Sequence, residues 1–415
     1  MYVADSRASA HGAVRPRAGR RRAAVAPTVL ALGTVSLVTD VSSEMVTAVL
    51  PLYLVTGLGL SPLGFGLLDG IYNGFSALVR LVGGHFADRG GGRHKWVAGL
   101  GYGISAVCKP LLLAAHSLTP IGVVLAVDRT GKGLRTAPRD ALISLSSTPE
   151  TRGRAFGVHR AMDTAGALLG PLVAFLILRA TVDGYDAVFT VSFCVAVLGV
   201  LVLVLFVPGG RRDAVRDERP TVRAALTLLR GRDLRRITVC ALLLGLATVS
   251  DSFVYLLLQR RLGVPDRWFA LLPLGTAAAF LLLAVPLGRL ADRVGRWAVF
   301  LAGHGALLAV YVLLLTSWHG PGLPYLVLAL HGGFYAATDG VLMAAASDSV
   351  PQTLRSSGLA VVQTGQALTR FACSLLFGAA WTVWGDRAAL AGAAVALAAC
   401  AAFSLTLRPK RTVPA

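Results

Sequence analysis

Long apolar stretches separated by short polar breaks run through the chain from about residue 28 to residue 407. Each is about as long as the 20 or so residues that an α-helix needs to cross the hydrocarbon core of a bilayer. The breaks, rich in Arg, Gly and Pro, divide the chain into twelve such stretches. The predicted spans are 28–55, 62–86, 96–116, 119–142, 154–179, 186–208, 236–259, 267–290, 296–317, 322–347, 355–379 and 387–407. The pattern predicts an all-α integral membrane protein with twelve transmembrane helices.

The loops between these stretches repeat. The segment 84–91, after the second span, carries a Gly, the run Ala-Asp-Arg and a second Gly, and the same residues return at 288–295 after the eighth span. A second echo joins 154–157, before the fifth span, to 355–358, before the eleventh, each with Arg first and Gly fourth. An internal repeat of about half the chain length indicates two pseudo-symmetric bundles of six helices.

The repeat divides the chain into five expected parts. They are a basic tail (1–27), an N-terminal bundle (28–208), a linker (209–235), a C-terminal bundle (236–407) and a short tail (408–415). A membrane sensor or a multi-pass enzyme usually adds a soluble domain or a catalytic cluster, for which the two tails leave little room. We therefore expect no enzymatic activity.

Composition supports the membrane assignment. Of the 415 residues, 55% are apolar and 15% are charged, whereas about 25% are charged in an ordinary soluble domain. The chain has 40 Lys and Arg against 21 Asp and Glu. The Lys and Arg residues gather in the tails, in 209–235 and in short turns. This distribution follows the positive-inside rule, so we expect a multi-pass protein of the cell membrane with both termini cytoplasmic. Aromatic residues do not interleave with the basic ones, so we expect no nucleic-acid partner.

Ionisable residues within the predicted spans are costly in lipid, and each is therefore a functional hypothesis. Asp40 and Glu44 lie four residues apart, on one face of the first helix. Two carboxylates so close cannot both be ionised cheaply, so one is expected to hold a proton near neutral pH. That property suits a proton carrier. Two alternatives remain: a structural salt bridge to Arg129 or Arg160, and direct contact with the cargo.

The fourth span carries a positive stripe. Its members, Arg129, Lys132, Arg135 and Arg139, fall within an arc of about 120°. The fork of an Arg side chain suits a carboxylate or a phosphate, so the stripe could hold an acidic or amphiphilic cargo. Alternatively, Asp128, Asp140 and the acids of the first helix neutralise most of it.

These motifs together resemble the major facilitator superfamily of secondary transporters, over nearly all of residues 28–407. The family signature GxLaDRxGR is matched at 84–93, with one extra Gly, and at 288–296 without insertion. The strings Asp-Val-Ser-Ser-Glu-Met at 40–45 and Gly-Lys-Gly-Leu-Arg-Thr-Ala-Pro-Arg-Asp-Ala-Leu-Ile at 131–143 are similar to a group of prokaryotic permeases whose cargoes are mostly unassigned.

The resemblance implies roles for several residues. The signature loops of the family fasten one bundle to the other, which assigns gating to Gly84, Asp88, Arg89, Gly91, Gly288, Asp292, Arg293 and Gly295. We expect Asp88 and Asp292 at the N-terminal end of the following helix. The antiporter motif GxxxGP is matched by Gly166, Gly170 and Pro171, and in the family it seals the cavity against proton leak. The resemblance also associates Arg129 with proton coupling, and together with the carboxylates Asp40, Glu44 and Asp163 it forms the expected coupling set.

The remaining polar residues of the spans are candidates for the substrate cavity: Asp69, Asn73, Lys132, Arg135, Arg139, Asp251, Tyr255, Tyr335, Asp339, Gln363 and Arg370. The sequence thus predicts a secondary active transporter that exports a small organic molecule in exchange for protons. Its alternatives are a proton symporter that imports a metabolite and a transporter-like sensor. No cofactor is expected, and the His residues lack metal-ligand spacing. The expected partners are membrane lipid, protons and a small molecule, and one chain is expected to suffice.

Overall fold

The computed structural model describes the backbone of residues 25–89, 94–182, 184–209, 227–318, 320–350 and 355–407. Within these ranges it describes all side chains except those of 76–89, 149, 150, 355–357 and 360. The described residues form helices joined by short connections, and no strand occurs among them. The predicted all-α class is confirmed.

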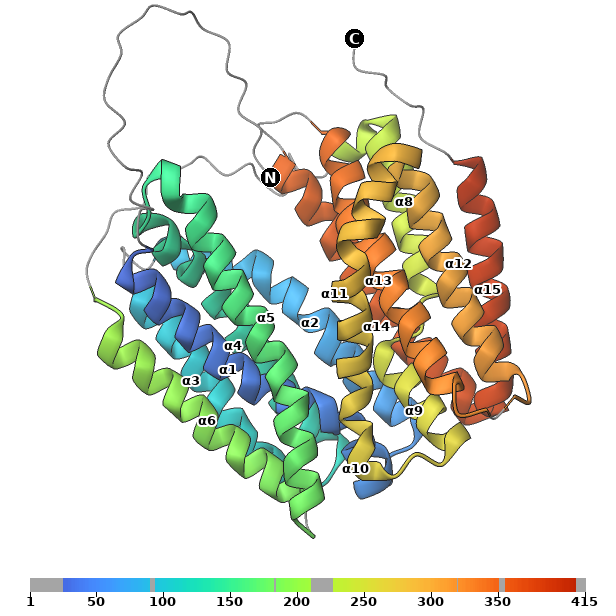
Figure 1. The fold of residues 1–415 in the computed structure, drawn as a ribbon, viewed down its shortest axis with the longest axis horizontal. Coiled ribbons are helices and arrows are strands. Elements are labelled where there is room, and N and C mark those ends of the chain that lie inside the picture. The colour runs from blue at the N-terminus through green and yellow to red at the C-terminus, as the bar shows by residue number, and fades with distance from the viewer. Residues whose placement is uncertain are drawn as a thin grey trace, which may run out of the picture.

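The first half of the chain contains six long helices (Figure 1). They are α1 (Pro27–Leu52), which continues into the π-helical turn η1 (Tyr53–Gly57), α2 (Pro62–Arg89), α3 (His94–Ala114), α4 (Leu118–Leu145), α5 (Pro149–Ala180) and α6 (Gly184–Phe206). Each corresponds to one of the first six predicted spans, with ends that differ by five residues or fewer.

The second half also corresponds to six predicted spans, but two of them are interrupted. After a 3₁₀ turn, η2 (Leu228–Arg230), its helices are α8 (Arg232–Leu246), α9 (Asp251–Leu262), α10 (Asp266–Phe269), α11 (Leu271–Val294), α12 (Arg296–Leu315), α13 (Leu323–Asp348), α14 (Arg355–Trp384) and α15 (Asp386–Thr406). The spans predicted as single helices at 236–259 and 267–290 are thus each two helices in succession.

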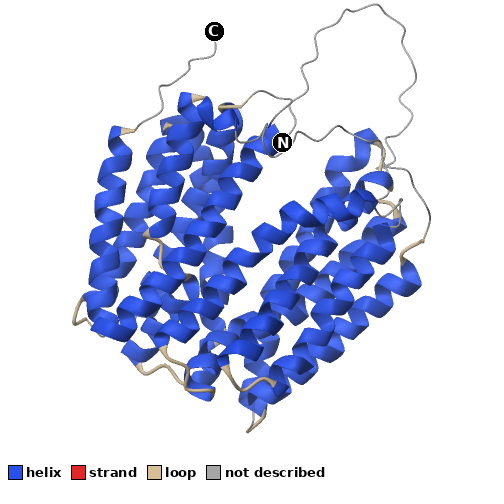
Figure 2. Cartoon of the chain, turned by 180° about the vertical axis from the view of Figure 1, so that it is seen from behind, coloured by secondary structure: helices blue, strands red, loops and turns tan. Residues whose placement is uncertain are grey.

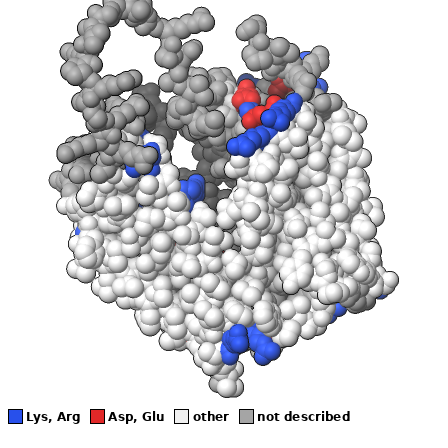
Figure 3. Space-filling view, in the orientation of Figure 1, with Lys and Arg blue, Asp and Glu red and all other residues white. Residues whose placement is uncertain are grey.

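The helices form two bundles, α1–α6 and α8–α15 (Figures 1 and 2). In the first, α1 packs on α5 and α6, and α4 on α2 and α3; in the second, α13 packs on α11 and α12. The bundles meet chiefly where α2 contacts α14, with a smaller contact between α5 and α11. They diverge toward the end at which α8 begins, and Figure 3 shows the surface hollowed between them on that side.

The outer surface suits lipid. Ten helical segments of the described chain are long and apolar enough to cross a membrane. Figure 3 shows a broad band without charged side chains between Lys and Arg groups at its two edges. Large apolar side chains such as Leu205, Leu282 and Val383 are exposed. The two remaining long helices, α2 and α4, are less apolar, and α4 carries four cations and two acids. Because α4 contacts α1, α2, α3 and α5, neighbouring helices surround these charges.

Glycine residues allow α2 and α14 to approach closely at the seam between the bundles. A Cβ atom on Gly66 would lie 2.4 Å from the Ser374 carbonyl oxygen, and one on Gly378 would lie 2.5 Å from the Pro62 carbonyl oxygen. Both distances are too short for any side chain. Gly at these positions therefore brings the two backbones into direct contact.

Candidate functional site

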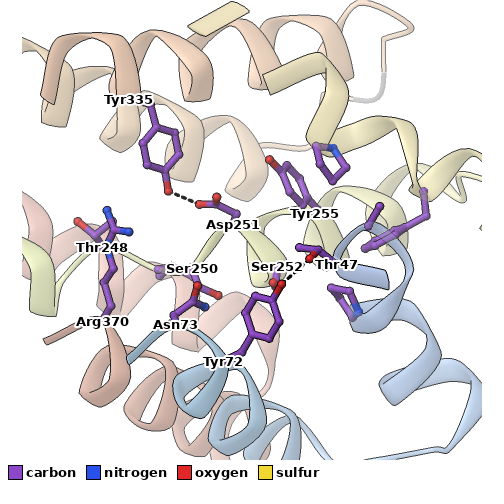
Figure 4. A pocket seen from close by; sticks show the side chains of 15 residues that line it. Thr47, Tyr72, Asn73, Thr248, Ser250, Asp251, Ser252, Tyr255, Tyr335 and Arg370 are labelled. Atoms are coloured by element: carbon purple, nitrogen blue, oxygen red, sulfur yellow. Dashed lines mark hydrogen bonds between the residues drawn. The ribbon is translucent and has the colours of Figure 1, made fainter. Parts of the chain in front are cut away.

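A pocket of about 120 Å³ lies between the two bundles. Figure 4 shows its walls, with Tyr72 and Asn73 from α2 facing residues of the C-terminal bundle. Five of the predicted cavity residues line it: Asn73, Asp251, Tyr255, Tyr335 and Arg370. Other polar lining residues are Thr47, Tyr72, Thr248, Ser250 and Ser252. Hydroxyl groups and aromatic rings thus make up much of the wall.

The interruption between α8 and α9 places Asp251 in this pocket. Residues 247–250 leave the helix, and Asp251 is the first residue of α9. The break exposes backbone groups that require partners in a membrane interior. Tyr311, whose side chain is fully buried, supplies them: its hydroxyl accepts from the Val249 N–H at 2.7 Å and donates to the Ala247 carbonyl at 3.3 Å. Interrupted helices of this kind commonly form the binding sites of transporters.

Asp251 has two partners on α13. The Tyr335 hydroxyl donates a hydrogen bond to its carboxylate (Figure 4), and His331 Nε2 lies 3.6 Å from Asp251 Oδ1. The His331 ring is buried, and its Nδ1 lies 3.4 Å from the Thr276 hydroxyl. Sequence reasoning missed His331. Its spacing of four residues from Tyr335, which puts both on one helix face, was the available signal.

Arg370 of α14 is the cation of the pocket lining. One guanidinium nitrogen lies 4.0 Å from Asp339 of α13, and both side chains remain substantially exposed. Gln363, also on α14, is exposed, and its amide donates to the Met343 sulfur at 3.6 Å. Neither Asp339 nor Gln363 belongs to the pocket lining as described.

Asp69 lies behind the pocket wall. Its carboxylate is buried and accepts hydrogen bonds from the Ser374 hydroxyl at 2.7 Å and from the Asn73 amide at 3.2 Å. Asn73 itself faces the pocket. Asp69 thus joins the two bundles at their seam and orients a pocket residue, and it does not line the pocket.

The cations of α4 are each paired with an acid. The pairs are Arg129 with Asp128 at 2.6 Å, Lys132 with Glu44 at 3.9 Å, Arg135 with Asp40 at 3.4 Å, and Arg139 with Asp140 at 3.1 Å and with Asp163 at 3.6 Å. This is the neutralised arrangement that the sequence analysis left open. The acids of α1 are bridged to Lys132 and Arg135, and not to Arg129 or Arg160, the partners named for the structural alternative.

Arg129 belongs to a buried cluster of its own. Asp128 also accepts a bond from Lys109 of α3 at 3.3 Å, and the Arg129 guanidinium stacks over the Tyr72 ring at 3.8 Å. Tyr72 in turn is hydrogen-bonded to Thr47, a second pocket residue. Arg129 therefore supports one wall of the pocket. Tyr72 was not predicted from the sequence.

A second cluster surrounds Asp40. Arg135 contacts it on one side, and the carboxylate of Asp163, on α5, lies next to it. Asp163 is reached by Arg139 and, at 3.8 Å, by Arg160. Among the described side chains, its Oδ1 is one of the buried oxygens without a hydrogen-bond partner. The close carboxylate neighbour of Asp40 thus comes from another helix, while Glu44 has a separate cation.

The glycines of the GxxxGP motif hold α5 against α1. A Cβ on Gly166 would lie 2.4 Å from the Leu37 carbonyl oxygen, and one on Gly170 would lie 2.6 Å from the Glu44 Cβ. Pro171, the next residue, is also buried. The motif therefore packs directly beside the acids of α1.

The second of the repeated loops, between α11 and α12, lies at the end where the bundles diverge (Figure 1). Asp292 lies in the last turn of α11. The expectation that it begins the next helix is therefore wrong. Asp292 pairs at 3.8 Å with Arg296, the first residue of α12, which also binds Asp348 of α13. The exposed Arg293 follows it, Gly288 lies one turn earlier in α11, and Gly295 adopts a φ of 104°. In the first copy, Gly84, Asp88 and Arg89 fall within α2, but their side chains lie outside the described residues, as does Gly91 entirely.

The described residues contain no group of three or more His, Cys, Asp or Glu that could hold a metal ion.

Comparison with known proteins agrees with this architecture. A family model described as Major Facilitator Superfamily matches residues 32–374 and 270–415. An uncharacterised MFS-type transporter of Methanocaldococcus jannaschii is 29% identical over 374 residues, which cover 89% of this chain and 92% of the relative. An uncharacterised protein of Mycobacterium tuberculosis is 33% identical over 182 residues, 44% of this chain and 41% of its own length.

Solved structures share the fold. The nucleoside transporter NupG superposes with a TM-score of 0.75 at 13% identity, over 92% of this chain and 97% of NupG. A bacterial homologue of the human lysosomal transporter Spinster gives a TM-score of 0.72 at 16% identity, over 93% and 98%. With two related bundles, a pocket between them and a family match over most of its length, the chain belongs to the major facilitator superfamily of secondary transporters, multi-pass membrane proteins that move a solute by alternating access.

Proposed function

We propose that this transporter exports a small organic molecule in exchange for protons. The observation that carries the proposal is the contact of Asp40 with Asp163 between Arg135 and Arg139, inside the N-terminal bundle and apart from the pocket. It supplies a site for a proton that is separate from a site for cargo.

The chemistry of the Asp40 cluster suits a proton that binds and leaves. Two adjacent carboxylates repel each other when both are ionised, and one proton shared between them removes that repulsion. Proton binding also weakens the attraction of Asp40 for Arg135, which joins α1 to α4. The protonation state is thereby linked to the packing of these helices, as a coupled transporter requires.

The packing of α5 against α1 supports export. Gly166 and Gly170 bring these two helices into close contact beside Glu44. The family resemblance associates this motif with antiport. Symport would use the same acids, so it is the competing outcome of the experiment below.

We also propose how the protein is oriented in the membrane. The two bundles, 28–208 and 236–407, rock about the pocket as units. Both termini and the linker 209–235 lie in the cytoplasm, because basic residues gather there. The end at which the bundles diverge then faces the cytoplasm, one chain forms the complete transport unit, and the protein lies in the cell membrane.

The test uses inside-out membrane vesicles from cells that express the full chain. The lumen is acidified, a small-molecule extract of the same cells is added outside, and mass spectrometry identifies the compounds that accumulate inside. Export by antiport predicts accumulation that depends on the acid lumen and disappears in Asp40→Asn. Loss of a compound from a preloaded lumen on acidification would instead establish symport and overturn the proposed direction.

A further inference from the structure

We propose that the exported molecule carries an amine, and that its protonated nitrogen binds Asp251 in the pocket. The inference rests on the proposed transport function and adds the chemical class of the cargo. It comes from which charged groups reach the pocket and which do not.

The cations of α4, which favoured an acidic cargo at the level of sequence, are not available to one. Each lies within 2.6–3.9 Å of a carboxylate oxygen. None of the four is among the lining residues of the pocket as described. Among the described lining residues, Arg370 is the cation that an anionic cargo would bind.

Arg370 is itself partly neutralised. Asp339 lies 4.0 Å from its guanidinium, so that among the described side chains that line the pocket or pair with its lining, Asp251 and Asp339 oppose one cation. Behind the wall, the buried Asp69 beside Asn73 is offset by the Lys109, Asp128 and Arg129 cluster behind Tyr72, which carries one excess positive charge. His331 contributes positive charge only when it is protonated. The electrostatic balance of the described groups therefore favours a cationic ligand over an anionic one.

Asp251 has the room and the acceptor capacity to take such a ligand. Its side chain is 42% exposed. A carboxylate offers about four acceptor positions, of which Tyr335 uses one. Asp251 is the first residue of α9, and the positive end of that helix dipole stabilises its ionised carboxylate.

Aromatic rings complete the site. Tyr72, Tyr255, Phe269 and Tyr335 line the pocket together with Asp251. The face of an aromatic ring attracts an ammonium group within about 6 Å. Tyr72 already holds one cation in this way, the Arg129 guanidinium. A carboxylate beside several aromatic rings is a suitable environment for an alkylammonium group, and a poor one for a carboxylate or a phosphate.

The test measures binding to the detergent-purified full chain by thermal unfolding at neutral pH, because a ligand that binds the folded state raises the unfolding midpoint. The probes are two matched trios that share a skeleton and differ in the end group. The first is phenethylamine, phenethyl alcohol and hydrocinnamate; the second is isoamylamine, isoamyl alcohol and isocaproate. The amine of at least one trio should stabilise the protein more than its alcohol or acid.

Variants locate the effect. Asp251→Asn should weaken the apparent affinity for the amine by roughly tenfold or more, and Asp251→Glu, which keeps the charge, should retain binding. Asp186→Asn, a change at an exposed carboxylate at the start of α6, is the matched control and should bind like the wild type. If Asp251→Asn does not fold, the comparison of the amine with its alcohol and acid on the wild-type protein still tests the inference.

Three results would overturn the inference: stabilisation by the acid of a trio that is lost in Arg370→Gln, amine binding that is unchanged in Asp251→Asn, or no stabilisation by either trio. The vesicle experiment separates this failure from failure of the proposed function. Accumulation that depends on Asp40 without amine binding would reject only the cargo class. Amine binding without accumulation would reject only proton-driven export.

Discussion

The hydroxyl of Ser374 donates a 2.7 Å hydrogen bond to the carboxylate of Asp69, and this bond joins α14 to α2 across the seam of the two bundles. The backbones beside it touch at Gly66 and Gly378. A buried acid with a partner on the opposite bundle, flanked by residues without side chains, makes this seam a specific contact between the halves. Any movement of one bundle against the other has to slide along it or open it.

Gly378→Ala should therefore weaken the seam, because the new Cβ would lie 2.5 Å from the Pro62 carbonyl oxygen. Overpacking of this kind costs about 1–3 kcal/mol, so the thermal unfolding midpoint in detergent should fall. Gly392→Ala on α15 is the matched control, since no atom lies within 4 Å of the position that its methyl group would take. Equal midpoints for the two variants would show that the seam tolerates a methyl group.

Asp40→Asn should uncouple transport from the proton gradient. The variant cannot share a proton with Asp163, and it leaves the buried Arg135 without its acid, so the unfolding midpoint is measured alongside transport to show that the variant is folded. We expect loss of accumulation driven by an acid lumen, while exchange of labelled for unlabelled cargo across vesicles without a gradient continues. Asp186→Asn serves as the control. Accumulation at the wild-type rate in Asp40→Asn would remove this residue from the coupling mechanism.

The Lys109, Asp128 and Arg129 cluster predicts an order of stabilities. Asp128→Asn leaves two buried cations without their acid, whereas Arg129→Gln leaves the Lys109–Asp128 pair intact. Breaking a buried ion pair costs about 3–5 kcal/mol when a charge is left alone. Asp128→Asn should therefore lower the unfolding midpoint more than Arg129→Gln does. The reverse order would mean that the stacking of Arg129 on Tyr72 outweighs the charge balance.

Tyr311→Phe should destabilise the break that carries Asp251. Without the hydroxyl, the Val249 N–H loses its 2.7 Å partner, and an unsatisfied buried donor costs about 1–3 kcal/mol. The measurement is the unfolding midpoint together with amine affinity, both of which should fall. Tyr325→Phe, at a ring that is 77% exposed, is the control. If Tyr311→Phe keeps the unfolding midpoint and the amine affinity of the wild type, other groups satisfy the backbone N–H and carbonyl of the break.

Hydropathy and the repeated loops were sufficient to predict the spans, the two bundles and the family, because lipid imposes length and polarity on every crossing helix. They could not predict which charges pair. Arg135 reaches Asp40 because of the rotation of α4 against α1, and the contact of Asp40 with Asp163 depends on two helices far apart in sequence. The break after Leu246 was missed because residues 247–250 contain neither Gly nor Pro. The succession of Ser250 and Asp251, typical of a helix start, was its one local signal.

The charge content of α4 also constrains how the protein is made. A helix with four cations and two acids cannot reside alone in hydrocarbon at reasonable cost. Its counter-charges lie on α1 and α3, which are synthesised before it, and on α5, which follows. The insertion machinery must therefore release α4 into lipid in company with its neighbours, so that assembly of the first bundle is a collective step in biogenesis and not a sequence of independent insertions.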